Sequence, residues 1–554
     1  MKKILLTALT ALTITTAVGQ AFFTPTSYRG AFAPAPTNMW TDTWTEWDPQ
    51  NKVYPTVAAT TVTGNITTST TWSGVVLLSA QCFVKNNSTL TILPGTIILG
   101  DKAVSGAGLF ITNGSKLIAV GTVSNPIVFT SNQAPGVRGL GDWGGVVLMG
   151  LAPNNSPAGT GTLSNPAGTN YVEGLPISSD TQYGGSNTND NSGNLQYVRI
   201  EFGGYVYQPN KEINGLTFCA VGNATTIDYI QCSFTNDDSF EWFGGNVNCK
   251  HLVAYRGLDD DFDTDNGYSG YVQFCLGVRD PSISDNPSVS TSEGFESDND
   301  PSGTANTPLT SAIFSNVTDI GPLRGVLTAT YATGFRRGAR IRRNSNLKIF
   351  NTILMDHATR GVYIDGNACE ANAVSGALSF ANNIVAGYGI RATESQTTVT
   401  AFNGTINAWV TPMNDTLKTT AGILVNPYVY LTPDYRPIAA GIAGAGASFT
   451  ATPFAGIVTG IANTTSKQIG LVTLSPNPSI DATNLTIFSN FKTIATVGLY
   501  DVTGKLVAII AKHAEITEGN NIFKINTAEL TSGVYFVTIQ SSLGKETVKL
   551  LISK

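Results

Sequence analysis

Charged residues are scarce in this chain. Asp, Glu, Lys and Arg make up 13% of its 554 residues, about half of the ~25% usual in soluble globular domains. Helices normally expose Lys, Glu and Arg to water, whereas strands and turns are well served by Thr, Ser, Asn and Gly. The shortage of charge, together with 57 glycines, argues against a mostly helical enzyme and predicts an all-β fold.

A basic surface and histidine are also lacking. The net charge of -6 provides no basic stripe for a polyanion, so we expect no nucleic-acid partner. Only three histidines occur, at positions 251, 357 and 513. A Ser-His-Asp triad or a zinc site is therefore poorly supported.

The six cysteines do not define a disulfide pattern. They allow three bridges in an oxidising export route, but six cysteines can pair in 15 ways. Cys232 takes the place of Ile200 in a repeat described below and is interpreted as a small core residue. A bridge from Cys219 to Cys249 or Cys275 stays open.

Long apolar runs are missing after residue 20, and a membrane-spanning helix needs about 20 apolar residues. We therefore expect that the chain is not an integral membrane protein. Residues 1–20 combine Lys2 and Lys3 with an apolar run from Ile4 to Val18 and a small-residue exit at 17–19. This order is typical of a secretory signal peptide.

The middle of the chain is a repeat. Segments 195–202, 227–234 and 249–256 align without gaps, and the last two begin 22 residues apart. Segment 347–354 matches 378–385 in the same way. A unit of about 22 residues fits three short strands with turns, one coil of a parallel β-helix, better than leucine-rich or WD40 repeats. Asn351 and Asn382 occupy equivalent places and suggest an inward asparagine ladder.

A family resemblance supports this interpretation. The phrases at 90–98, 109–111, 117–122 and 126–131 resemble the opening coils of pectin-lyase-like right-handed β-helix surface proteins. The resemblance implies a right-handed parallel β-helix, which we place at 71–438, after an N-terminal extension or cap at 21–70. Lyases, hydrolases, adhesins and passive stalks share this fold, so it does not define an activity.

The C-terminal segment 467–554 alternates short apolar runs with turn residues, which predicts a small β-sandwich. An Ala, Gly and Thr-rich linker at 439–466 precedes it. Its ordered motifs resemble the type A C-terminal sorting domain of type IX secretion. The motif residues are Pro476, Asn477, Pro478, Gly504, Gly533, Tyr535 and Lys549. The resemblance implies the type IX secretion machinery as a partner and a secreted or cell-surface location.

Three closely spaced tryptophans, Trp40, Trp44 and Trp47, mark the N-terminal extension. They can stack on sugars as a ligand-binding cluster, or pack as a lid on the open end of the β-helix. We favour the lid.

Acidic turns form the strongest candidate site. At about 5 Å and an effective dielectric near 20, neighbouring carboxylates repel by roughly 3 kcal/mol, so a counter-charge is expected. Calcium fits, because it takes six to eight oxygen ligands; splayed, solvated turns without metal are the alternative. The predicted calcium ligands are Asp259, Asp260, Asp261, Asp263, Asp265, Glu296 and Asp298.

The same region allows an enzyme interpretation. A lyase resembling the pectate type would use a nearby Lys or Arg as base, and Arg256 and Arg279 are nearest in sequence. A hydrolase would use a carboxylate pair such as Asp238 with Asp260. A basic run at 336–343 either grips an acidic glycan or, as we favour, pairs with the acidic turns. We interpret the chain as an exported binding or structural protein that contacts surface glycans or neighbouring cells. A calcium-dependent polysaccharide lyase or glycoside hydrolase, or a surface-layer subunit, are the alternatives.

Overall fold

A computed structural model describes residues 22–159, 166–208, 211–396, 414–450, 454, 472–489, 492–502, 505–517, 519–541 and 544–554. The expected signal peptide lies outside this part of the chain. The structure divides into two compact units, with the boundary after Thr459. The first unit is called the body here, and the second the C-terminal unit.

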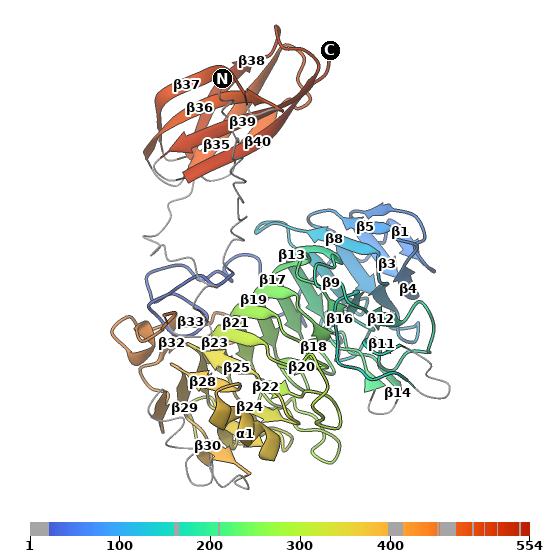
Figure 1. Cartoon of the computed structure of the whole chain (residues 1–554), viewed down its shortest axis with the longest axis vertical. Coiled ribbons are helices and arrows are strands. Elements are labelled where there is room, and N and C mark those ends of the chain that lie inside the picture. The colour runs from blue at the N-terminus through green and yellow to red at the C-terminus, as the bar shows by residue number, and fades with distance from the viewer. Residues whose placement is uncertain are drawn as a thin grey trace, which may run out of the picture. The chain divides into compact units, whose positions relative to one another are not determined.

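The body is wound from two parallel sheets (Figure 1). Sheet A has 17 strands in the described residues: β1 (Thr60–Val62), β2 (Thr70–Trp72), β3 (Val75–Leu78), β5 (Thr89–Ile92), β6 (Ile97–Gly100), β8 (Lys116–Val120), β9 (Ile127–Ser131), β13 (Gly193–Glu201), β17 (Thr226–Ser233), β19 (Asn248–Tyr255), β21 (Tyr271–Val278), β23 (Ile313–Ile320), β25 (Lys348–Phe350), β26 (Ile353–Met355), β28 (Ser379–Ala381), β29 (Ile384–Ala386) and β31 (Asp415–Leu417).

Sheet B has ten strands in the described residues: β4 (Gln81–Val84), β7 (Gly108–Ile111), β10 (Val146–Met149), β16 (Leu216–Val221), β18 (Phe240–Gly245), β20 (Phe262–Asp265), β22 (Phe295–Ser297), β24 (Arg337–Arg342), β27 (Arg360–Asp365) and β30 (Arg391–Ser395). Insertions add three antiparallel hairpins and two helices: β11 (Thr169–Tyr171) with β12 (Gln182–Gly184), β14 (Val206–Gln208) with β15 (Lys211–Glu212), β32 (Leu424–Asn426) with β33 (Asp434–Pro437), α1 (Asn367–Ser375) and the short 3-10 helix η1 (Ile442–Gly444).

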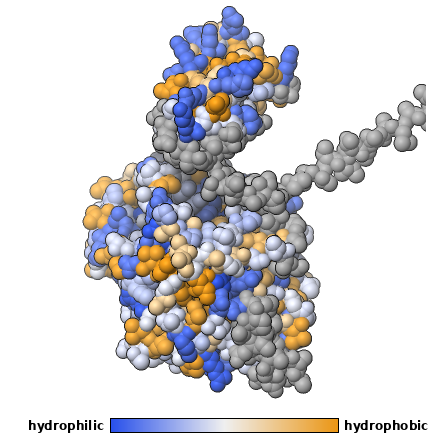
Figure 2. Space-filling view, turned by 90° about the vertical axis from the view of Figure 1, so that its left-hand side faces the viewer, coloured by the Kyte–Doolittle hydropathy of each residue, from blue (hydrophilic) through white to orange (hydrophobic). Residues whose placement is uncertain are grey.

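The sequence repeat sets the register of the coils. Ile200, Cys232 and Ala254 follow one another across β13, β17 and β19, as the gap-free alignment requires. Like residues therefore stack inside the coils, as in the rings of Phe240, Phe262 and Phe295, whose successive centroids lie 5.9 and 5.2 Å apart. The predicted right-handed parallel β-helix is confirmed. Hydrophilic and apolar residues are mixed in small patches on the face of the body in Figure 2.

The asparagine ladder lies one residue further along than expected. Asn351 and Asn382 have φ of 53° and 59° and turn the chain. The next position carries the ladder, because the Asn383 carboxamide accepts the Thr352 N–H at 2.9 Å and the Asn414 carboxamide accepts the Asn383 N–H at 2.8 Å.

The N-terminal segment 22–54, called the strap here, runs along the outside of sheet A. Trp44 is fully buried. Trp40 lies 5.1 Å from His251 and Trp47 lies 5.1 Å from Tyr255, measured between ring centroids. These partners belong to β19 in the middle of the body. The expected lid over an open end is therefore wrong, and the rings cover a flank instead.

All six cysteines, each in the described part of the chain, are buried free thiols. The open possibility of a bridge from Cys219 therefore does not hold in this structure. Among the described residues, no helix has the length and apolar character that a bilayer span requires.

The C-terminal unit is an antiparallel β-sandwich, as predicted. One sheet joins β34 (Val472–Ser475), β35 (Ala482–Ser489) and β38 (Gly519–Asn526), and the other joins β37 (Leu506–Ile516), β36 (Thr493–Asp501), β39 (Gly533–Ser541) and β40 (Gly544–Ile552). A separate apolar core fills it.

Among the predicted sorting motif residues, Asn477 holds the last strand of this sandwich. The Asn477 carboxamide donates to the Lys549 carbonyl and accepts the Leu551 N–H, both at 2.8 Å. Pro476 and Pro478 flank Asn477, Gly533 opens β39, and Tyr535 packs near the core. Gly504 lies outside the described residues.

Candidate binding groove

The acidic turns precede strands of sheet B and stack from coil to coil. Asp238 Oδ1 accepts the Asp260 N–H at 2.8 Å, and Asp260 Oδ1 accepts the Glu293 N–H at 2.6 Å. Glu293 Oε2 in turn accepts the Arg337 N–H at 2.6 Å. Each carboxylate therefore caps a backbone donor of the next coil, which gives these side chains a structural task.

A second acidic column stands on the outer face of sheet B. Side chains alternate between the two faces of a strand, so the inward rings of β18, β20 and β22 leave the residues after them facing outward. Glu241, Asp263 and Glu296 are neighbours in register, and Arg340 follows Glu296 in β24.

Half of this acidic surface lacks a counter-charge. Carboxylate oxygens lie within 4.8 Å of one another in three groups of the described residues: Asp237, Asp238 and Asp259; Asp238, Glu241 and Asp263; and Asp260, Asp263 and Glu296. No ion pair within the described residues reaches Asp238, Glu241 or Asp263, nor Asp259 or Asp260. Oδ1 of Asp259 and Oδ1 of Asp263 are buried without a hydrogen-bond donor.

Burial and mutual repulsion favour the protonated forms of these acids. Burial, followed by the charges of neighbouring carboxylates, raises the pKa of Asp238, Glu241 and Asp263 well above the ordinary value. Burial, followed by the charge of Asp285, raises the pKa of Asp259 to about 7. At neutral pH this surface therefore holds protons or needs a cation.

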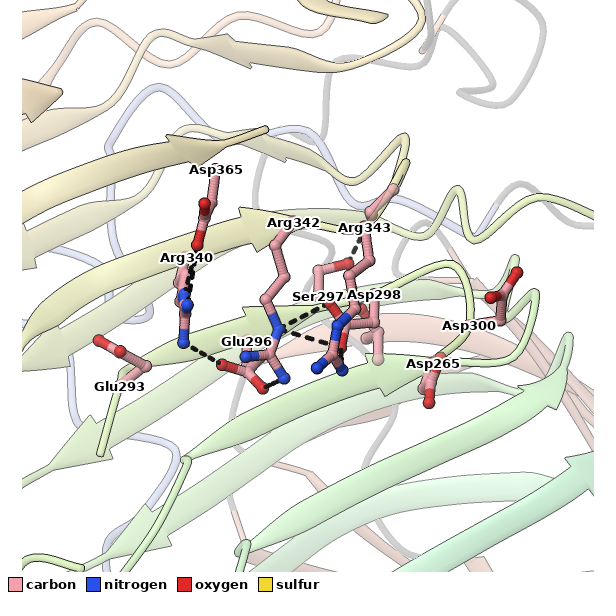
Figure 3. A network of polar contacts seen from close by, with 12 residues as sticks. Asp265, Glu293, Glu296, Ser297, Asp298, Asp300, Arg340, Arg342, Arg343 and Asp365 are labelled. Atoms are coloured by element: carbon pink, nitrogen blue, oxygen red, sulfur yellow. Dashed lines mark hydrogen bonds and ion pairs between the residues drawn. The ribbon is translucent and has the colours of Figure 1, made fainter. Parts of the chain in front are cut away.

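The other half is neutralised by the basic run (Figure 3). Asp298 accepts from Arg342 Nε at 2.8 Å and from Arg343 at 2.7 Å, and Glu296 pairs with Arg342 and with Arg340. Arg337 also pairs with Glu293 at 2.6 Å. The predicted pairing of the basic run with the acidic turns is thus found, and it leaves these arginines engaged.

Asp261 and Arg279 point into the body and pair with each other. Their Oδ2 and Nε atoms lie 3.0 Å apart, and both side chains are buried. Asp319 and His357 lie beside them, with Oδ1 and Nε2 3.6 Å apart. Burial, followed by the charge of Arg279, lowers the pKa of His357 to about 3. We call these four residues the inner cluster.

Neither arginine proposed as a lyase base fits that task. Arg279 is 2% exposed and cannot reach a ligand on the surface. Arg256 pairs with Asp280 and lies over the rings of Phe234 and Tyr430, at 4.6 and 4.5 Å from their centroids. It follows β19 of sheet A and does not line the cavities described next.

Three adjoining cavities lie over the outer face of sheet B, and together we call them the sheet B groove. The acidic cavity, of about 580 Å³, is lined by Asp238, Glu241, Asp259 and Asp263. The arginine cavity, of about 400 Å³, is lined by Arg340, Arg342 and Arg343. The tyrosine cavity, of about 580 Å³, is lined by Tyr171, Tyr183, Phe243 and Asp265.

Shared walls make these cavities continuous. Glu173 lines both the tyrosine and the acidic cavity. Ser302 lines the tyrosine and the arginine cavity, and Arg342 and Arg343 line the arginine and the acidic cavity. A chain-like ligand can therefore contact all three.

Of the predicted calcium ligands, the structure gathers some and separates others. Asp259, Asp260, Asp263 and Glu296 belong to the carboxylate groups. The remaining three do not: Asp261 faces the interior, Asp298 is held by arginines, and Asp265 lines the tyrosine cavity. Trp40, Trp44 and Trp47 line none of the three cavities.

Sequence reasoning missed one wall of the groove. This wall comes from two insertions on either side of β13. The first carries β11 and β12 and supplies Tyr171, Glu173 and Tyr183; the second carries β14 and β15 and supplies Lys211. Neither insertion follows the 22-residue repeat, so no periodic signal pointed to them.

Stacked parallel coils, followed in the sequence by a small antiparallel β-sandwich, define the class of right-handed parallel β-helix proteins. Residues 64–422 match the family model for a pectate-lyase-like beta helix domain, and residues 473–553 match that for a secretion system C-terminal sorting domain. The chain belongs to the pectate-lyase-like β-helix family and carries a type IX sorting domain. It is therefore secreted or displayed at the cell surface.

No curated protein matches the sequence. Among solved structures, full-length tailspike protein 2 from a bacteriophage of Escherichia coli O157:H7 matches 86% of this chain at 10% identity and a TM-score of 0.25. The chain spans 64% of that tailspike's length. The enzymatically active domain of tailspike protein 2 from bacteriophage CBA120 matches 86% of this chain and 72% of its own, at 10% identity and a TM-score of 0.17. Likeness at this level carries no statement about activity.

Proposed function

We propose that this secreted protein binds an acidic glycan, of the cell surface or of neighbouring cells, in the sheet B groove. The proposal depends on one observation. The groove floor has carboxylates without a counter-charge on one side and arginines on the other, and Arg342 and Arg343 line both the acidic and the arginine cavity. A cation on the acidic side can bind carboxylates of a ligand. On the other side Arg343 is 42% exposed while it pairs with Asp298, so its remaining N–H groups can donate to the same ligand.

Calcium is the cation that the donor set fits best. The groups of carboxylates offer hard oxygen ligands within 4.8 Å of one another, and calcium binds six to eight such oxygens in flexible geometry. The buried, donor-free Oδ1 atoms of Asp259 and Asp263 would otherwise remain without a partner. Bound calcium would supply the counter-charge and sites for ligand oxygens.

Binding is favoured over lyase chemistry because the basic side chains of the groove are already in ion pairs. Among the described residues that line the three cavities, Lys211 pairs with Glu173, and Arg340, Arg342 and Arg343 pair with acids. A β-elimination would need an unpaired base beside the sugar.

A glycoside hydrolase is the second candidate. Glu241 and Asp263 line the acidic cavity, their oxygens approach within 4.8 Å, and their pKa values are raised. A carboxyl that keeps its proton can act as general acid beside an ionised partner, and retaining enzymes place the pair about 5 Å apart.

Calorimetry with the purified protein and acidic polysaccharides, in calcium and in EDTA, tests the binding. We expect saturable binding in calcium that EDTA weakens; no binding across a broad panel would refute the proposal. Absorbance at 235 nm and reducing ends are followed in the same samples. Product formation that Asp263→Asn removes would establish the enzyme instead.

A further inference from the structure

The tyrosine cavity differs in chemistry from the rest of the groove. Its floor is formed by Phe243 and Asp265, which are neighbours in register on β18 and β20 and face outward. Its wall is formed by Asn170 and Tyr183, which oppose each other across β11 and β12. Aromatic, amide and hydroxyl groups therefore surround one space of about 580 Å³.

Tyr183 offers an unused hydroxyl to this space. The residue is 2% exposed, and its ring packs in an apolar cluster with Phe110 and Val172. Its hydroxyl has no hydrogen-bond partner within the described residues, although the side chain lines the cavity. A buried phenol normally finds a partner, so this hydroxyl is available to a ligand.

The described lining of this cavity offers no unpaired cation. Its one basic side chain, Lys211, pairs with Glu173 at 3.1 Å. The carboxylate of Asp300 accepts hydrogen bonds from Ser302 and Thr304. An acidic sugar would therefore meet carboxylates here without a counter-charge, so the cavity disfavours it.

We infer that the tyrosine cavity is a subsite for a neutral pyranose. A pyranose has apolar C–H faces for the rings of Phe243 and Tyr171, and hydroxyls for Tyr183, Asn266 and Asn306. Because Glu173 joins this cavity to the acidic one, the ligand is a mixed polysaccharide in which neutral and acidic sugars alternate. This inference rests on the proposed glycan binding and specifies its substrate class.

Three hexasaccharides test it by calorimetry on the purified protein in calcium. One alternates N-acetylglucosamine with glucuronate, one is all galacturonate, and one is chitohexaose. We expect the alternating hexasaccharide to bind at least about 10-fold more tightly than either homopolymer. Loss of one neutral hydrogen bond corresponds to about 3- to 10-fold in affinity, so Tyr183→Phe should weaken the alternating ligand by that factor and leave oligogalacturonate unchanged.

Two further variants complete the design. Asn306→Ala, at the rim, should act like Tyr183→Phe, whereas Tyr388→Phe, far from the groove in sequence and outside its lining, should bind all ligands normally. Equal affinities for alternating and all-acidic ligands, or wild-type affinity in both groove variants, would overturn the inference while glycan binding stands. Failure of every acidic hexasaccharide to bind would instead defeat the proposed function.

Discussion

Asp238 accepts the backbone N–H of Asp260 in the next coil at 2.8 Å. A carboxylate of the acidic surface therefore also connects two successive coils of the repeat. The same contact recurs from Asp260 to Glu293. Asp238 and Asp260, two of the crowded carboxylates, therefore also satisfy backbone donors between coils, so their charge accompanies a structural role.

Substitutions at Asp238 should separate these two roles. Asp238→Ala leaves the buried Asp260 N–H without an acceptor and should lower the unfolding free energy by about 1–3 kcal/mol. Asp238→Asn keeps an acceptor and removes a repelling charge, so its stability should stay within about 0.5 kcal/mol of wild type. Urea unfolding measures both; equal losses would contradict the capping role.

Calcium binding should appear in thermal unfolding. Calcium at 100 times its Kd should stabilise the protein by about 2.7 kcal/mol. Asp263→Asn should remove most of this stabilisation, whereas Asp265→Asn, two residues away on the same strand but outside the carboxylate groups, should retain it. A melting temperature that neither calcium nor EDTA changes would eliminate the metal.

Without a cation, stability should fall as pH rises from 6.5 to 8. The pKa values of Asp259 and Asp265 are raised to about 7 and about 8 in the folded protein. In this window the folded state binds more protons than the unfolded state, so the unfolding free energy decreases with pH. His357, with its pKa lowered to about 3, acts in the opposite direction, but below pH 6.5. Melting temperatures in EDTA that rise toward pH 8 would contradict the assignment.

The inner cluster should respond unequally to substitution. Arg279→Met leaves Asp261 without its cation and should cost about 3–5 kcal/mol. Asp319→Asn should cost much less, because burial and the charge of Asp261 raise the pKa of Asp319 well above the ordinary value, which favours a neutral side chain. Denaturant midpoints compare the two variants; a larger loss for Asp319→Asn would show that the proton assignment is wrong.

Deletion of residues 468–554 should prevent export of the body across the outer membrane. The reason is the loss of the sorting domain matched at 473–553. Cell fractionation with an antibody to the body measures the outcome, and a carrier fused to 468–554 provides the control. Normal surface display of the truncated protein would argue against this dependence.

The repeat made the fold predictable, because stacked coils convert sequence alignment directly into strand register, as for Ile200, Cys232 and Ala254. The site was predictable only in part. Asp260 and Asp261 are adjacent in the turn before β20, yet Asp260 accepts the Glu293 N–H and Asp261 pairs with the buried Arg279. A turn has no regular alternation of side chains, so the sequence could not separate the two roles. Tyr183 could not be predicted as a site residue, because it lies in an insertion that does not follow the repeat.

The strap gives the body a mechanical property that coils alone do not have. Stacked repeats contact only their neighbours and can open from one end. The strap instead hydrogen-bonds through Gly30 to Asn351, through Thr24 to Gln273, through Glu46 to Gln231 and through Gln50 to Gly136. Pulling on the coil that carries Asn351 therefore transmits force through the strap to the segment around Gly136. The coils between these two points should yield together under shear and not unwind one by one.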